Sequence, residues 1–149
     1  MKRIIRGFML SLLAFVVLFT QTGCKLDMND LSGDWTVETI DGKAPIDYAT
    51  DMDLPEVAVI TNYKITETTF TMEDYAGYIT LNIEPRTNGF ECTEPEKNQI
   101  VLSVLYDSWN DTLKFRMDNG YGSLTTFTAK RGSVDIDAMM EEYIASHQE

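Results

Sequence analysis

Apolar and more polar residues alternate with a period of two along most of the chain. In 77–84, for example, Ile79, Leu81 and Ile83 alternate with more polar neighbours. This pattern puts successive side chains on opposite faces of a strand and is typical of antiparallel sheets with one solvated face. It predicts eight strands, of which the fifth is short and weak: 35–40, 57–64, 68–73, 77–84, 90–92, 99–106, 112–117 and 123–131.

Short turn sequences separate several of these strands: Asp41-Gly42, Asn88-Gly89 and Asp118-Asn119-Gly120. Their residues tolerate positive φ and suit hairpins. Short connections favour an up-and-down meander, and closing it removes the exposed edges of an open sheet. We therefore predict an all-β fold, an up-and-down antiparallel eight-stranded barrel. The link at 42–56 is longer, and loops of this length are usually functional or mobile.

The period changes near the C-terminus. Ile136, Met139, Met140, Tyr143 and Ile144 form one stripe of an amphipathic helix. We expect this stripe to pack against the outside of the barrel. A helix lying on a membrane surface would need basic flanks, and its acidic residues argue against that role.

The first 23 residues have the features of an export signal. Lys2, Arg3 and Arg6 precede an apolar run at 7–19, which is shorter than a membrane-spanning helix. Gly23-Cys24 after this run resembles the lipobox of bacterial lipoproteins, although Gln21 stands where that family usually has an aliphatic residue. The resemblance implies that the Cys24 thiol receives a diacylglyceryl group and becomes the mature N-terminus. The alternative is a simple secretory peptide with an incidental cysteine.

The predicted organisation is a cleaved signal peptide at 1–23, a lipidated tether at 24–32, and a barrel with its helix at 33–149. Lys25 takes the place of the aspartate that retains lipoproteins at the inner membrane. By family resemblance this points to a bacterial outer-membrane lipoprotein, and Asp27 and Asp30 make surface display, rather than a periplasmic location, a hypothesis.

Charge limits the partners. The whole chain has a net charge of −12, and the 126 residues after the signal carry 9 basic and 24 acidic side chains, a net charge of −15. Such a domain is unsuited to nucleic acid and is repelled by anionic bilayers, so the acyl group has to supply the membrane attachment.

The start of the mature chain resembles a known family of barrels. Gly33-Asp34-Trp35 is similar to the Gly-x-Trp signature that opens the first strand of lipocalins, and the order of elements is also similar. In that family the tryptophan plugs the closed end of the barrel and a basic residue on the last strand covers it. The resemblance implies that Trp35 is a core residue, covered by Lys130 or Arg131.

Residues for catalysis or metal binding are scarce. His147 is the single histidine, and zinc sites and Ser-His-Asp or Cys-His arrangements need more. The acidic clusters do not reproduce a calcium-binding loop. Cys92 has no partner if Cys24 is acylated, and we expect it to be buried rather than reactive. We predict no enzyme activity, no metal and no cofactor.

One short motif indicates a modification. Asp111-Thr112-Leu113 resembles the acceptor sequence that some bacteria rich in surface lipoproteins glycosylate at the hydroxyl. The simpler interpretation is that Thr112 opens a strand.

Ligand binding is the remaining function. If the first strand starts at the closed end, the links at 42–56, 74–76, 93–98 and 118–122 meet at the open end. Candidate ligand contacts there are Tyr48, Met52, Tyr75, Glu94 and Tyr121, while Trp109 falls at the closed end. Two hypotheses remain: a lipid-anchored binding module for a small apolar or amphipathic molecule, or an interaction lipoprotein with a filled barrel and an envelope-protein partner.

Overall fold

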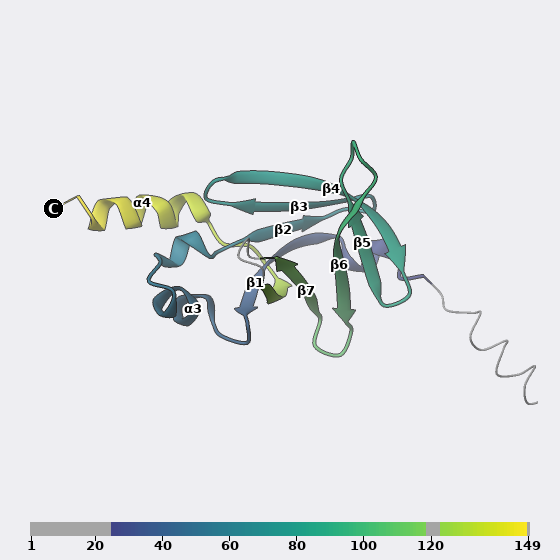
Figure 1. Cartoon of the computed structure of the whole chain (residues 1–149), viewed down its shortest axis with the longest axis horizontal. Coiled ribbons are helices and arrows are strands. Elements are labelled where there is room, and N and C mark those ends of the chain that lie inside the picture. Colours follow the sequence, from purple (N-terminus) through teal and green to yellow (C-terminus); the bar gives the residue numbers. More distant parts are fainter. Residues whose placement is uncertain (1–24, 119–122, 149) are drawn as a thin grey trace, which may run out of the picture.

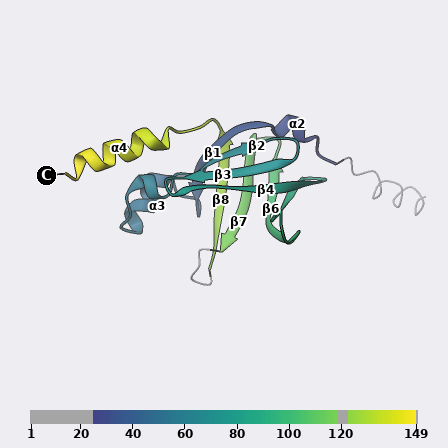
Figure 2. The same ribbon diagram turned by 90° about the horizontal axis from the view of Figure 1, so that it is seen from above.

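The chain folds into a closed antiparallel barrel of eight strands (Figures 1 and 2). This computed structural model describes residues 25–118 and 123–148. The strands follow one another around the barrel in chain order: β1 (Gly33–Ile40), β2 (Asn62–Ile65), β3 (Thr69–Asp74), β4 (Gly77–Arg86), β5 (Gly89–Thr93), β6 (Ile100–Asp107), β7 (Thr112–Asp118) and β8 (Leu124–Arg131). Pairing of β8 with β1 closes the barrel. The all-β, up-and-down eight-stranded barrel predicted from the alternation is therefore confirmed, and it is consistent with the lipocalin-like fold that the Gly-x-Trp resemblance implied.

The weak fifth strand is present, which fixes the end at which each connection lies. Links 41–61, 75–76 and 94–99 follow β1, β3 and β5 at one end, called the open end here, and β7 ends on the same side. The other links lie at the opposite, closed end. Gly89 begins β5 at a φ of +157°, and a Cβ there would lie 1.9 Å from the carbonyl oxygen of Val104 on β6. Glycine is therefore required for β5 to lie beside β6.

Two parts of the long first link differ from the prediction. The second strand begins at Asn62 rather than at 57, because 56–58 form a 3-10 helix, η1 (Glu56–Ala58). The link also holds a short helix, α3 (Pro45–Asp51). Pro45 stands in the first turn of α3, where its fixed φ favours a helix and its missing N–H costs nothing. Ala49 and Val57 are buried, so this segment packs on the barrel rather than forming a bare loop.

The C-terminal helix, α4 (Ile136–Ser146), lies outside the barrel as predicted, but only part of its apolar stripe is covered. Its apolar contacts are concentrated in its first turns, where Ile136 is buried and Met139 and Met140 are partly buried. Its body contacts η1 and extends beyond the barrel, leaving Ile144 46% exposed (Figure 1). The direction of the helix is set by the link after β8. Asn62 holds this link in place because it exchanges two hydrogen bonds with the backbone of Val134.

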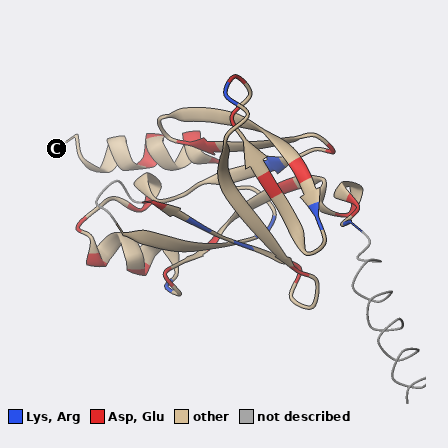
Figure 3. Ribbon diagram, turned by 45° about the vertical axis from the view of Figure 1, so that its right-hand side comes forward, with Lys and Arg blue, Asp and Glu red and all other residues tan. Residues whose placement is uncertain are grey.

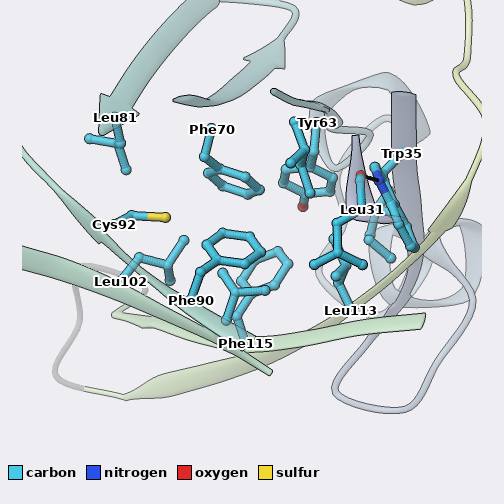
Figure 4. Packing of buried hydrophobic residues seen from close by; sticks show 14 of the residues in the cluster. Leu31, Trp35, Tyr63, Phe70, Leu81, Phe90, Cys92, Leu102, Leu113 and Phe115 are labelled. Carbon is cyan, nitrogen blue, oxygen red and sulfur yellow. Dashed lines mark hydrogen bonds between the residues drawn. The ribbon is translucent and has the colours of Figure 1, made fainter. Parts of the chain in front are cut away.

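Aromatic side chains fill the closed half of the barrel (Figure 4). Tyr63 stacks on Phe70 at a centroid distance of 5.6 Å, and Phe115 meets Tyr63 edge-on at 5.3 Å. The ring of Phe90 on β5 also packs against the ring of Phe70. Offset and edge-on pairs of this kind add about 0.5–1.5 kcal/mol each beyond burial of their area. This cluster leaves no room for a ligand at its level.

The N-terminal segment completes this core. A short helix, α2 (Met28–Leu31), places Met28 and Leu31 against the closed end, where both are buried. The backbone N–H of Leu26 donates to the carbonyl of Arg86 at 3.0 Å. Most of the expected tether is thus part of the barrel base. None of the helices in the described part of the chain is long and apolar enough to cross a membrane.

Two polar groups are buried among apolar neighbours. Cys92 is fully buried and free, and burial raises the pKa of its thiol to about 12. It packs as a small apolar side chain, as expected. Burial also raises the pKa of Tyr63, and the nearby Thr61 opposes this only in part. The hydroxyl of Tyr63 has no hydrogen-bond partner among the described residues.

Candidate functional site

The inward-facing residues of the open half are aliphatic or thioether side chains, and some are exposed. On β4, Leu81 lies opposite Phe70 of β3 and is 5% exposed. Two residues along the same face, Ile79 lies opposite Met72 and is 58% exposed. Moving two residues along β4, from Leu81 to Ile79, therefore leads from the packed core to an open space.

This space is a cavity of about 290 Å³ at the open end. We call it the mouth cavity; its lining residues are Met72, Ile79, Leu81, Glu94, Val101, Leu102 and Met117. An adjoining hollow of about 300 Å³ shares Met72, Ile79 and Met117 and reaches Thr61 and Asp74. Together they fall within the size range of small-molecule sites, which are typically apolar with a few polar groups.

A second hollow opens through the barrel wall between β6 and β7. These strands pair only through 104–107 and 112–115, so 100–103 and 116–118 face each other without pairing. The resulting lateral groove encloses about 630 Å³; its lining residues are Ile100, Val101, Leu102, Ser103, Leu105, Lys114, Phe115, Arg116 and Leu124. Leu102 and Phe115 are buried core residues and form its floor. The groove thus reaches the barrel interior from the side.

The two hollows differ in charge. Glu94 is the one ionisable residue that lines the mouth cavity, and Lys97 Nζ lies 3.2 Å from its carboxylate. The lateral groove is lined instead by two cations, Lys114 and Arg116. Neither forms an ion pair among the described residues.

Most of the described residues proposed from sequence as ligand contacts do not line these hollows. Tyr48 lies on α3 and packs partly buried against the core, while Met52 and Tyr75 are 55% and 53% exposed. Only Glu94 of the proposed group lines the mouth cavity. Tyr121 lies outside the described residues. The actual lining comes from strand residues such as Ile79 and Met117, whose alternation marks them as inward-facing but does not show that space remains beside them.

The closed end is built around Trp35. Its ring is fully buried, and its indole Nε1 donates to the carbonyl of Leu31 at 2.9 Å. The guanidinium of Arg131 covers the ring, with Cζ 4.0 Å from the ring centroid. Arg131 also donates to the carbonyls of Asp30, Leu31 and Ser32. Gly33, at a φ of +124°, lets the chain pass from α2 into β1 beside this arginine.

An ion pair joins Arg131 to Asp111 in the loop between β6 and β7. Asp111 accepts from Arg131 Nε at 3.3 Å and from the hydroxyl of Tyr106 at 3.0 Å. Thr112, the residue of the modification motif, follows it at the start of β7 and is partly buried. Trp109 is 96% exposed in the same loop.

The described residues offer no arrangement for metal chemistry. None of their His, Cys, Asp and Glu side chains form a group of three or more suited to a metal ion. His147 caps the end of α4, where its ring lies 4.3 Å from that of Tyr143, far in the fold from both hollows. Cys92 is buried in the core and separated from solvent.

Comparison with known proteins yields no relative: no family model, no curated protein and no solved structure matches the chain. A function for this chain is therefore proposed from the geometry of its own residues.

Replacing Arg131 tests whether the hydrogen bonds and the cation–π contact of its guanidinium stabilise the closed end. We expect Arg131→Ala to lower the free energy of unfolding by about 2–3 kcal/mol, because it removes a cation–π contact and several charge-assisted hydrogen bonds. Arg131→Lys, which keeps only the charge, should lose about half of that. Urea unfolding gives these values, with Lys130→Ala as an exposed neighbouring control. A loss for Arg131→Ala no larger than that of the control would contradict the assignment.

Proposed function

We propose that this protein is a lipid-anchored envelope binding protein that holds a small apolar or amphipathic ligand in the open end of its barrel. The eight-stranded barrel supplies the scaffold. The export signal and the lipobox-like Gly23-Cys24 support attachment to a bacterial outer membrane through acyl chains.

The observation that carries this proposal is the exposure of Ile79 on an inward face. Its neighbour Leu81 is packed against the aromatic cluster, whereas Ile79 and the side chains around it border about 290 Å³ of open space. Exposing inward apolar side chains to water is unfavourable by roughly 1.5–3 kcal/mol each relative to burial. A bound apolar group would recover this energy. An interaction lipoprotein with a filled barrel would not need such a cavity.

The position of the anchor agrees with this use. Leu26 pairs with Arg86 at the closed end, so an acyl group on Cys24 attaches to that end of the barrel. The mouth cavity then faces away from the bilayer, toward the aqueous space. Trp109 is exposed at the closed end as well, and tryptophan is enriched where proteins meet the membrane interface.

Filling the mouth cavity should abolish binding. We expect the neutral apolar probe N-phenyl-1-naphthylamine to bind the wild-type protein saturably, with a rise in its fluorescence. Ile79→Trp places an indole in the cavity and should weaken binding at least about tenfold, the effect of losing roughly 1.4 kcal/mol of contact. Thr80→Trp adds the same group to the solvated face of β4 and should leave binding unchanged. Non-saturable binding, or equal loss in both variants, would refute the site.

Acylation is tested by mass and by phase partition. When the full chain is made in a bacterium that processes lipoproteins, we expect a mature protein that begins at Cys24, carries acyl chains and enters the detergent phase of Triton X-114. Cys24→Ser should remain in the aqueous phase, because it has no thiol to acylate. A wild-type protein that partitions with the Cys24→Ser variant and lacks the acyl mass would show that the segment is a simple secretory signal.

A further inference from the structure

Two basic residues flank the lateral groove in a chain that is otherwise strongly acidic. Lys114 and Arg116 alternate along β7 with the buried Leu113 and Phe115, so both basic side chains lie on the outer face. The ion pairs of the described residues involve other basic side chains: Lys43, Arg86, Lys97 and Arg131. Lys114 and Arg116 are thus available to an anion from outside the chain.

Facing these cations is an apolar wall. Ile100, Val101, Leu105 and Leu124 line the same groove and are between 49% and 64% exposed. Leu105 is the direct register partner of Lys114. A hollow with apolar sides and a cationic edge is complementary to a molecule that has an apolar chain and an anionic head.

The gap between β6 and β7 joins this groove to the mouth cavity. Val101 and Leu102 line both hollows. On β7, Met117 lines the mouth cavity and its neighbour Arg116 lines the groove, because consecutive residues of a strand point to opposite faces. A chain that crosses the gap between the unpaired edges of the two strands therefore passes from the groove to the mouth cavity.

We infer that the ligand is a single-chain amphiphile with an anionic head, a carboxylate or a phosphate, held between Lys114 and Arg116 while its tail enters the mouth cavity through the gap between β6 and β7. This inference rests on the proposed function and names the class of ligand. The head lies outside because both cations line the groove, whereas no basic residue is among the described residues that line the mouth cavity.

Four probes with the same twelve-carbon chain test the head group: dodecanoate, dodecyl phosphate, dodecanol and dodecyltrimethylammonium. We measure how well each displaces N-phenyl-1-naphthylamine from the wild-type protein, below its micelle concentration or, for dodecanol, below its solubility limit. We expect an anion to compete about tenfold better than dodecanol, the effect of two partly exposed charge-assisted contacts, and the cation to compete least. Preference for dodecanoate identifies a fatty acid, and preference for dodecyl phosphate identifies a phospholipid head; either result supports the inference.

Two double variants distinguish the effect of the groove cations on binding from an effect of net charge. Lys114→Gln with Arg116→Gln should bring the anions down to the level of dodecanol without changing dodecanol itself. Lys64→Gln with Lys130→Gln removes the same charge from residues that do not line the groove, and should leave the preference for anions intact.

The outcomes distinguish this inference from the proposed function. If dodecanol competes as well as the anions, or both double variants have the same effect, the anionic head is wrong while apolar binding in the mouth cavity stands. If the fluorescent probe itself does not bind, the proposed function fails. Loss of dodecanol binding in the Lys114 and Arg116 variant would indicate damage to the fold and overturn the assigned role of these two cations.

Discussion

The interior of an eight-stranded barrel is just wide enough to be filled by side chains, so the size of its inward-facing residues decides where space remains. Here Trp35, Tyr63, Phe70, Phe90 and Phe115 lie toward the closed end and fill it. The inward positions toward the open end carry smaller or thinner side chains, such as Ile79 and Met117. The uneven distribution of aromatic residues along the barrel axis therefore creates both the stable core and the cavity.

The closed end depends on one further contact, the stacking of Arg131 on Trp35. Arg131 connects the last strand to the carbonyls of α2 and of Ser32, which holds this segment against the closed end of the barrel. The same side chain thus covers the core and fixes the position of the segment that precedes β1. In Figure 3 the positions of Asp and Glu, coloured red, are distributed over many elements of the ribbon, and such an excess of acidic residues favours solubility.

Sequence reasoning predicted the strands because alternation reports directly which face of a strand is buried. It predicted the weak strand at 90–92 as well, and with it the end at which Trp109 lies. It did not predict α3, because the link at 42–56 has no apolar period of its own and its helix is only seven residues long. It placed α4 outside the barrel correctly but did not show that only the first turns of its apolar stripe are covered, because a stripe does not specify how far its covering surface extends.

The site was harder to predict than the fold for a physical reason. Whether Ile79 borders a space depends on the residues that seven other strands contribute at the same level, and alternation within one strand contains no such information. The lateral groove depends on the register at which β6 and β7 cease to pair, which is a property of two strands together. Tyr48, Met52 and Tyr75 were plausible contacts by residue type, but the cavity is lined mainly by aliphatic strand residues.

Methyl NMR of methionine-labelled protein tests the central claim, that the barrel is packed at one end and accepts a ligand at the other. Met72 and Met117 line the mouth cavity, whereas Met28 is buried at the closed end. On titration with dodecanoate, we expect saturable shifts of the Met72 and Met117 methyl resonances with no change at Met28. Shifts at Met28 of equal size, or no shift at any methionine under saturating ligand, would contradict it.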